Sequence, residues 1–506
     1  MKYLLTNEQM READSYTINV LGTPARTLME RAGEALAKET EKFSKTGAVL
    51  CVCGGGNNGG DGFVCARILQ TRGYDVDVLF FAKKLSNDCA YNRERWMEIG
   101  GKTYEAFPKK DYAVIVDCLF GTGFHGSLQG ENFSVVQEIN ARKKGGAKVL
   151  SADIPSGING GNGKAEAGAV YADVTLCIGE YKIGAFLQDG LDYSGEVKRA
   201  DIGIPLPETD GEKSAFPYVE LADFEYVKNR LPMRKRNSHK GTYGRAAIVA
   251  GSLEYTGAAY LSASACLRSG AGYTTLYLPS GILPYYVLKA PEILLKPSNN
   301  GDRYEFNEEK AAELLAYDSI AYGMGMGVSE QVAQGAEYLL KNYTGKLLLD
   351  ADGLNSLAQY SADSVIGLLR EKKCEAVLTP HAKEFSRLSG LPMEKILQAS
   401  LSSSVEFANK TRSVILLKGA SSIVTDGEKT VLVTAGNAGL AKGGSGDVLS
   451  GVIAGLCASG ADVFDGGVCA AFLVGKAAVL GTAEKGEYSL TATDVISYLG
   501  GAFLSV

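Results

Sequence analysis

The chain has 506 residues, of which 45% are hydrophobic and 22% are charged. This composition excludes a disordered or fibrous protein, and the length is too great for one core, so we expect two large domains. The net charge of -6 excludes a bulk electrostatic attraction to nucleic acid or to anionic lipid. Glycine is the one outlier, with 62 residues, and indicates specialised loops.

The start of the chain turns polar at Thr6, too early for a signal peptide, and no run reaches about 18 uninterrupted apolar residues. We therefore expect a cytoplasmic protein that uses no membrane. The ten cysteines stand in apolar runs and are expected to be buried free thiols. The closest pair, Cys51 and Cys53, is interpreted as lying on opposite faces of a strand rather than as a redox or zinc site.

Residues 6–43 have a helical pattern that begins with a capping box of Thr6 and Gln9. Short, continuous apolar runs follow, separated by amphipathic segments, at 48–53, 74–81, 112–120, 147–154 and 172–179. Runs of this kind are typical of strands buried on both faces. The sequence therefore predicts an α/β domain with a parallel sheet.

The pattern dissolves between about residues 203 and 244, where prolines and a basic cluster occur. We place the first domain at residues 1–212, a linker at 213–240 and the second domain at 225–506, whose start overlaps the linker. Strand-like runs resume at 245–252, 273–279, 319–325, 346–353, 375–380 and 413–419, with a hairpin at 423–434 and a long apolar segment after Gly443. These runs predict a second α/β domain, and no fixed-period repeat links it to the first.

The loop at residues 54–62, Gly-Gly-Gly-Asn-Asn-Gly-Gly-Asp-Gly, directly follows one predicted strand and precedes a helix. Backbone N–H groups at such a helix start suit a phosphate or pyrophosphate, and a merely flexible loop is the alternative. Asp117 and Asp153 close two further strands, and ligands gather at the carboxyl ends of parallel strands. These carboxylates could hold a hard cation or move protons, although loop or capping roles are the alternative for each.

A second glycine-rich segment, residues 437–451, runs into an apolar helix near Asp447. There a carboxylate could accept a proton from a substrate hydroxyl while backbone N–H groups stabilise a phosphoryl group, and an N-capping role is the alternative. Lys418 ends a strand before the hairpin and suits a nucleotide. His381 stands between a strand and a helix, where ligand contact and a structural role are both open. The chain has no P-loop lysine motif and no histidine cluster, which argues against Walker-type ATPases and zinc enzymes.

The motifs LMERAG, GGGNNGGDG, VDCLFGTG and DIPSG resemble those of the NAD(P)H-hydrate epimerase domain, over about residues 1–210. The resemblance implies a Rossmann-like fold that binds NADHX and NADPHX, the C6-hydrated forms of NADH and NADPH. It implies that Asn58, Asp117 and Ser156 bind K⁺ and that Asp153 is the catalytic carboxylate and contacts substrate. The remaining substrate contacts that it implies are Asn57, Asn58, Gly59, Gly60, Asp61, Gly121, Thr122, Gly123, Phe124, His125, Gly126 and Ser127.

Residues 225–506 resemble the ADP-dependent NAD(P)H-hydrate dehydratases, a branch of the ribokinase-like fold, in DADGLN, TPHAKE, LLKG and AKGGSGDVLSG. The resemblance implies Mg²⁺-assisted phosphorylation of the C6 hydroxyl of the S hydrate by ADP, followed by loss of phosphate. Asp447 would activate that hydroxyl. The implied nucleotide contacts are Lys418, Gly419, Ala420, Ser421, Ser422 and Gly446, and the implied hydrate contacts are Ala258, Gly325, His381 and Asp447. The chain departs from the family with GMGMG at 323–327 and with Ser445 in place of a frequent Thr.

Together the two resemblances predict a bifunctional enzyme that repairs hydrated nicotinamide coenzymes. The alternative is a ribokinase-like small-molecule kinase with a non-catalytic nucleotide-binding N-terminal module. We expect a homo-oligomer with small-molecule substrates and no nucleic-acid partner. The basic stretch 230–245 is interpreted as a solvated linker or a phosphate-facing loop.

Overall fold

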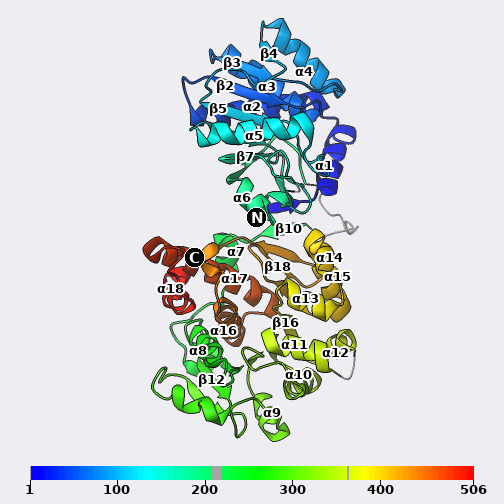
Figure 1. Cartoon of the computed structure of the whole chain (residues 1–506). Coiled ribbons are helices and arrows are strands. Elements are labelled where there is room, and N and C mark those ends of the chain that lie inside the picture. The colour runs from blue at the N-terminus through cyan, green and yellow to red at the C-terminus, as the bar shows by residue number, and fades with distance from the viewer. Residues whose placement is uncertain (1, 166, 207–217, 362–363) are drawn as a thin grey trace. The chain divides into compact units, whose positions relative to one another are not determined.

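The computed structural model describes residues 2–165, 167–206, 218–361 and 364–506. The chain divides into two compact units, Lys2–Tyr218 and Val219–Val506. Each unit is an α/β structure built around a largely parallel sheet (Figure 1).

The sheet of the first unit has the order β4-β3-β2-β5-β6-β7-β9, and every neighbouring pair is parallel. Its strands are β2 (Val49–Cys53), β3 (Val76–Leu79), β4 (Lys102–Tyr104), β5 (Val114–Cys118), β6 (Lys148–Ala152), β7 (Val174–Ile178) and β9 (Glu196–Ala200). Two further strands of this unit, β1 (Tyr3–Leu5) and β8 (Tyr181–Lys182), pair in parallel. The helices are α1 (Asn7–Asn19), α2 (Ala25–Phe43), α3 (Asn57–Thr71), α4 (Asn87–Glu98), α5 (Gly130–Lys144) and α6 (Gly190–Tyr193).

Helices cover both faces of this sheet, which makes a three-layer unit (Figure 1). One buried cluster joins α2, α3 and α4 to alternate strand residues, and a second joins α5 to the residues between them. Strand side chains alternate between faces, so Cys51 and Cys53 share a face and belong to the same cluster. The prediction that these two residues face opposite sides of the strand was therefore wrong. All ten cysteines are free and buried, as expected.

The five strands predicted in the first half are confirmed as β2, β3, β5, β6 and β7. The capping box of Thr6 and Gln9 is also confirmed at the start of α1. The prediction of one helical stretch over residues 6–43 was wrong in one respect, because the helix is broken between α1 and α2. The break contains Gly22 in a left-handed conformation (φ 75°) and Pro24, which precedes the first residue of α2.

The sheet of the second unit has the order β13-β12-β11-β14-β15-β16-β17-β18-β19-β10. Neighbouring strands are parallel except in β17-β18-β19, where the predicted hairpin is confirmed. Its strands are β10 (Val219–Leu221), β11 (Arg245–Val249), β12 (Tyr273–Leu278), β13 (Leu294–Pro297), β14 (Ser319–Tyr322), β15 (Lys346–Leu349), β16 (Glu375–Leu378), β17 (Val414–Leu417), β18 (Ser422–Thr425) and β19 (Thr430–Val433). The main helices are α7 (Phe224–Arg230), α8 (Thr256–Leu267), α9 (Glu308–Leu314), α10 (Glu330–Asn342), α11 (Ala351–Tyr360), α12 (Val365–Glu371), α13 (Ala382–Ser389), α14 (Met393–Gln398), α15 (Ser400–Thr411), α16 (Ser445–Ala458), α17 (Val463–Lys485) and α18 (Ala492–Leu504).

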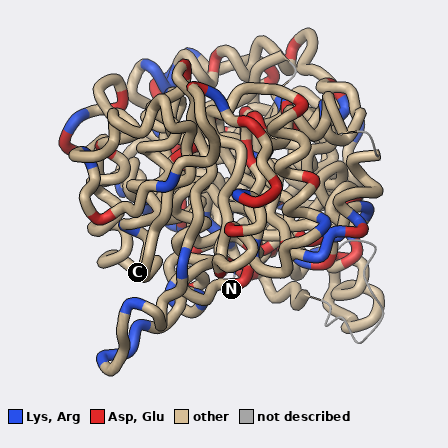
Figure 2. The backbone as a smooth tube through the Cα atoms, turned by 90° about the horizontal axis from the view of Figure 1, so that it is seen from below, with Lys and Arg blue, Asp and Glu red and all other residues tan. Residues whose placement is uncertain are grey.

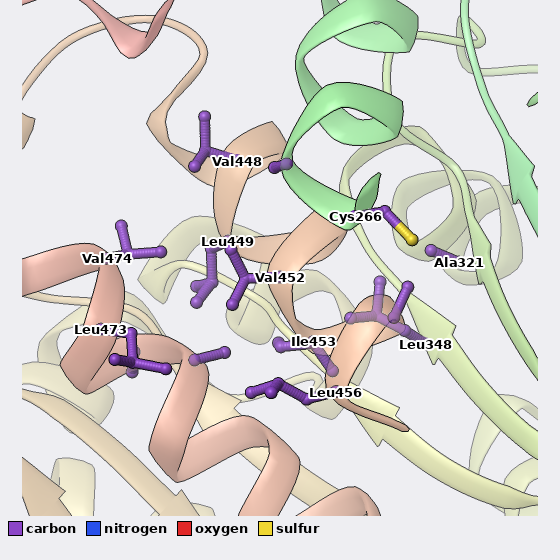
Figure 3. Packing of buried hydrophobic residues seen from close by; sticks show 14 of the residues in the cluster. Cys266, Ala321, Leu348, Val448, Leu449, Val452, Ile453, Leu456, Leu473 and Val474 are labelled. Atoms are coloured by element: carbon purple, nitrogen blue, oxygen red, sulfur yellow. The ribbon is translucent and has the colours of Figure 1, made fainter. Parts of the chain in front are cut away.

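The centre of the second unit is α16, whose apolar side chains pack against α8, α17 and the sheet (Figure 3). Leu449, Val452 and Ile453 are buried there. Among the described residues, α17 is the one helix long and apolar enough to cross a membrane, yet 72% of its apolar window is buried inside the protein. Burial in this core accounts for its composition.

The linker prediction was wrong for residues 219–230, which form β10 and α7 of the second unit; residues 207–217 lie outside the described residues. The hydroxyl of Tyr226 donates to Asp465 of α17 at 3.0 Å, and Arg230 pairs with the same carboxylate at 3.1 Å. Residues 233–242 are exposed and include the basic cluster. Elsewhere along the described residues, acidic and basic positions are interspersed (Figure 2).

Candidate active sites

The glycine loop of the first unit lies where sequence analysis placed it, between β2 and α3. A Cβ atom on Gly54 would lie 1.9 Å from the carbonyl oxygen of Leu119, and one on Gly59 would lie 1.8 Å from the carbonyl oxygen of Gly54. These approaches require glycine, so the loop is a packed structure and not merely a flexible one. It brings Asn57 and Asn58 into the first turn of α3.

A cavity of about 740 Å³ opens beside this loop. A cavity of this volume can hold a small-molecule ligand the size of part of a dinucleotide or larger. The residues that line it are Met10, Arg11, Asp14, Gly55, Gly56, Asn57, Asn58, Asp61, Leu119, Phe120, Gly121, Thr122, Gly123, Phe124, His125, Asp153, Ile178, Lys182 and Ile204. Most of the predicted substrate residues of this unit therefore meet at one cavity. Gly59 and Gly60 are buried behind its wall, and Gly126 and Ser127 are exposed outside it.

Asp153 is held at this cavity in an unusual backbone conformation, with φ 68°. Strain of this kind at a non-glycine residue persists only where the surroundings impose it, and it is common at functional sites. The ammonium of Lys182, whose side chain is 2% exposed, lies 2.6 Å from one Asp153 oxygen. Burial opposes the charge on Lys182, but its acidic neighbours, with Asp153 foremost, together raise the pKa of Lys182 above its ordinary value.

Two further carboxyl groups share the cavity with this ion pair. Burial, reinforced by the Asp153 charge and opposed by Lys182, raises the pKa of Asp14 to about 6. Burial also raises the pKa of Asp61 well above its ordinary value. The cavity thus combines the Lys182–Asp153 ion pair with two carboxyl groups whose pKa values are raised, an arrangement suited to proton transfer.

The three residues expected to hold a cation are connected through the backbone of Phe120. The hydroxyl of Ser156 donates to Asp117 at 2.6 Å and accepts from the Phe120 N–H at 2.9 Å. The side-chain amide of Asn58 donates to the Phe120 carbonyl at 2.9 Å, which leaves the buried Asn58 Oδ1 without a partner among the described residues. A buried amide oxygen without a partner and a buried carboxylate are ligand types that a hard cation prefers. Within the described ranges no group of three His, Cys, Asp or Glu side chains is placed to hold a metal ion.

In the second unit, polar groups collect at the carboxyl ends of β15 and β17. The Lys418 ammonium lies 2.7 Å from Asp350 Oδ1, and the Ser450 hydroxyl donates to Asp350 Oδ2 at 2.7 Å. A Cβ atom on Gly446 would lie 3.6 Å from the Lys418 ammonium, so the start of α16 adjoins this lysine. A large side chain at residue 446 would therefore pack against this ammonium.

Asp447 lies in the first turn of α16, and Gly444, with φ 95°, occupies the N-cap. The N-capping alternative for Asp447 was therefore wrong. Burial, reinforced by the charges of Asp350 and Asp352 and opposed by Lys418, raises the pKa of Asp447 to about 7. A carboxylate with such a pKa is suited to accept a proton at neutral pH.

His381 is the N-cap of α13, where its Nδ1 accepts from the backbone N–H groups of Lys383 and Glu384 at 3.1 and 3.2 Å. This bonding shows a structural role for one ring nitrogen, while the side chain stays 51% exposed. Ala258 and Gly325 are also neighbours, because a Cβ atom on Gly325 would lie 2.7 Å from that of Ala258.

Sequence analysis missed several charged residues of these sites. Lys182 and Asp14 line the first cavity, and Asp350 pairs with Lys418 in the second site. Asp350 ends a predicted strand in the quoted motif DADGLN, which was a usable signal. Lys182 follows the last predicted strand of the first domain, although its burial depends on contacts distant in sequence.

Fold and sites together define a two-domain α/β enzyme, with a Rossmann-like unit followed by a ribokinase-like unit. A family model described as NAD(P)H-hydrate dehydratase matches residues 246–500, and one described as YjeF-related protein N-terminus matches residues 25–184. The ADP/ATP-dependent NAD(P)H-hydrate dehydratase of Bacillus subtilis, co-crystallised with ATP/Mg²⁺, is a structural neighbour with a TM-score of 0.50 and 29% identity. The match covers 57% of this chain and 98% of that one.

Relatives similar over nearly the whole chain are bifunctional NAD(P)H-hydrate repair enzymes named Nnr. That of Thermofilum pendens is 33% identical over 495 residues, 94% of this chain and 92% of its own. That of Moorella thermoacetica is 31% identical over 519 residues, 98% of this chain and 96% of its own. The chain belongs to the family of bifunctional NAD(P)H-hydrate repair enzymes, which confirms the predicted resemblance and the predicted fold class.

Proposed function

We propose that the first unit interconverts (R)- and (S)-NAD(P)HX, and that the second converts the S form to NAD(P)H with ADP, releasing AMP and phosphate. One observation carries this proposal: a single chain of this family holds two separate acid–base sites, one around Asp153 and one around Asp447. Because a dehydratase specific for one epimer leaves the other unrepaired, the two activities belong together. We assign them to the domains at 1–212 and 225–506.

In the second site, Asp447 takes the proton of the C6 hydroxyl as that oxygen attacks the terminal phosphorus of the nucleotide. N–H groups at the start of α16 stabilise the charge that develops on the transferring phosphoryl group. Phosphate is a far better leaving group than hydroxide, so the ring nitrogen's lone pair can then expel it from C6. Loss of a proton from C5 then forms the C5=C6 bond of NAD(P)H. The nucleotide is assigned to Lys418–Ser422 and Gly446, and the hydrate to Ala258, Gly325, His381 and Asp447.

Mg²⁺ is supported by the relative crystallised with ATP/Mg²⁺. Mg²⁺ usually binds through substrate phosphates and few protein carboxylates. Within the described ranges no three His, Cys, Asp or Glu side chains are grouped to hold a metal ion, which fits binding of Mg²⁺ mainly through the phosphates. Both oxygens of Asp350 are engaged by Lys418 and Ser450, so phosphate oxygens would provide most of the ligands.

In the first site, the hydrate is assigned to the cavity between residues 57–61 and 121–127, where Asp153 moves a proton. K⁺ would be held by Asn58, Asp117 and Ser156, and the orphaned Asn58 Oδ1 supports this assignment. A bound cation would fix the loop that carries Phe120. The homo-oligomeric state and the cytoplasmic location stay predictions.

The test is an assay of the purified full chain on mixed (R)- and (S)-NADHX with ADP, followed by the absorbance of NADH. We expect complete conversion by the wild type. Asp153→Asn should stop after the S form is consumed, apart from slow uncatalysed interconversion, and Asp447→Asn should form NADH about 10²- to 10⁴-fold more slowly than the wild type. A stable phosphorylated product in place of NADH would contradict the proposal and favour the kinase alternative.

A further inference from the structure

Helix α1 lies outside the matched family segment 25–184 but forms one wall of the first cavity. Two contacts fix it there. The Asn7 side chain donates to the carbonyl of Thr122 in the loop 121–127 at 3.0 Å. The terminal methyl of Met10 packs against Gly179, where it would lie 2.8 Å from an added Cβ atom. Asn7, Met10 and Asp14 are spaced by three and four residues, so they share the helix face that meets the site.

Asp14 is thereby placed in the same cavity as Asp153 and Lys182. Resting on the proposed epimerase function, we propose that Asp14 is the second proton-transferring residue of that reaction and works together with Asp153. The two residues come from separate elements, α1 and the segment that follows β6, which gives the reacting carbon two proton-transfer groups in one cavity.

The chemistry requires two such groups. Inverting the configuration at C6 means that the hydroxyl leaves from one face and water adds to the other. In the R to S direction, the carboxylic acid of Asp14 protonates the hydroxyl oxygen, the C6–O bond breaks, and the ring nitrogen's lone pair forms a C=N bond. Water then adds to the opposite face of C6 and gives its proton to the Asp153 carboxylate. The proton returns from Asp153 to Asp14 through solvent, so atoms and charge balance.

The charged surroundings of Asp14 suit this role. The groups that line the cavity with it are Arg11 on its own helix, Asp61 on α3, His125 in the loop 121–127, Asp153 after β6 and Lys182 on β8. Lys182 pairs with Asp153, which leaves Asp14 as a carboxyl group without that ion pair. Burial raises the pKa of Asp14 to about 6, so both of its protonation states are populated near neutral pH.

The experiment uses the full chain with purified (R)-NADHX and no nucleotide, so that only epimerisation proceeds, and measures formation of the S form between pH 5 and 8. Uncatalysed interconversion is subtracted. Because Asp14 acts in its protonated form, we expect the wild-type rate to fall as the pH rises through about 6. Asp14→Asn should lower the rate by about 10²-fold or more and remove this fall. Asp14→Glu should retain the fall.

The matched control is Glu12→Gln, which removes an exposed carboxylate from the same helix outside the cavity and should change neither rate nor profile. Every variant should dehydrate (S)-NADHX with ADP at the wild-type rate, which shows that the second unit is folded. The epimerase activity that Asp14→Glu retains shows that a change at this position leaves the first unit folded. The inference is overturned if Asp14→Asn keeps the wild-type rate or pH profile, or if Glu12→Gln loses as much. A wild type that does not interconvert the epimers contradicts the proposed function itself.

Discussion

At the scale of single residues, the environment of Asp447 predicts the pH dependence of dehydration. Its carboxyl group has a pKa of about 7 because burial and neighbouring carboxylates disfavour the charge. A general base acts in its ionised form, so the rate of NADH formation from (S)-NADHX should rise as the pH increases through about 7 and level off above it. Initial rates between pH 5.5 and 8.5 at saturating ADP measure this profile.

Asp447→Asn should lower that rate by about 10²- to 10⁴-fold at every pH, which is the range for loss of a general base. Asp426→Asn, at the half-buried turn position between β18 and β19, is the control and should keep the profile. A wild-type rate that stays flat from pH 5.5 to 8.5 would contradict the role of Asp447 as base.

The same scale shows where sequence reasoning about the sites reaches its limit. Asp153 was predictable because it stands at the end of a predicted strand, and Asp447 because it stands in a glycine-rich segment at the start of an apolar helix. Lys182 was not, because a lysine after a strand is usually solvated, and its burial depends on Asp153, which lies 29 positions earlier. Asp14 was missed because nothing in α1 itself indicates that the helix faces a cavity.

At the scale of elements, the contact of α16 with α8 depends on glycine. A Cβ atom on Gly451 would lie 2.1 Å from the carbonyl oxygen of Ser262, a backbone atom that cannot move without shifting α8. Gly451→Ala should therefore lower the free energy of unfolding by about 1–3 kcal/mol, the usual cost of overpacking. Chemical denaturation of the full chain, followed in the transition of the second unit, measures the change.

Gly500→Ala is the matched control, because a Cβ atom at this exposed position of α18 meets nothing within 4 Å. Alanine in a helix interior is favoured over glycine, so this variant should be neutral or more stable by up to about 1 kcal/mol. Equal destabilisation by both substitutions would show that the contact between α8 and α16 is not the cause.

Strand prediction succeeded or failed for reasons visible in individual elements. β2 and β5 are buried throughout, so their continuous apolar runs identified them. β4 consists of exposed residues and β9 is mostly exposed or half-buried, and neither has an apolar run to detect. β10 and α7 were assigned to a linker because prolines and charges flank them, whereas contacts with α17 and β19 hold them in the second unit.

At the scale of the whole molecule, each compact unit contains its own candidate site, and this predicts where a nucleotide acts. A ligand that binds only the folded state stabilises it by about 2.7 kcal/mol at 100 times its Kd, and that stabilisation belongs to the unit that holds the ligand. ADP with Mg²⁺ should therefore slow amide hydrogen exchange at residues 418–422 and at the start of α16. The glycine loop 54–62 should exchange at its unliganded rate.

Hydrogen exchange of the full chain, read by mass spectrometry with and without ADP, makes this comparison within one sample. Asp153→Asn should leave the ADP-induced protection unchanged, because that residue belongs to the other unit. Gly446→Leu should abolish the protection, since a large side chain there would pack against the Lys418 ammonium. Protection by ADP at the loop 54–62 and none at residues 418–422 would reverse the assignment of the two sites, because the nucleotide would then bind where the hydrate alone is expected.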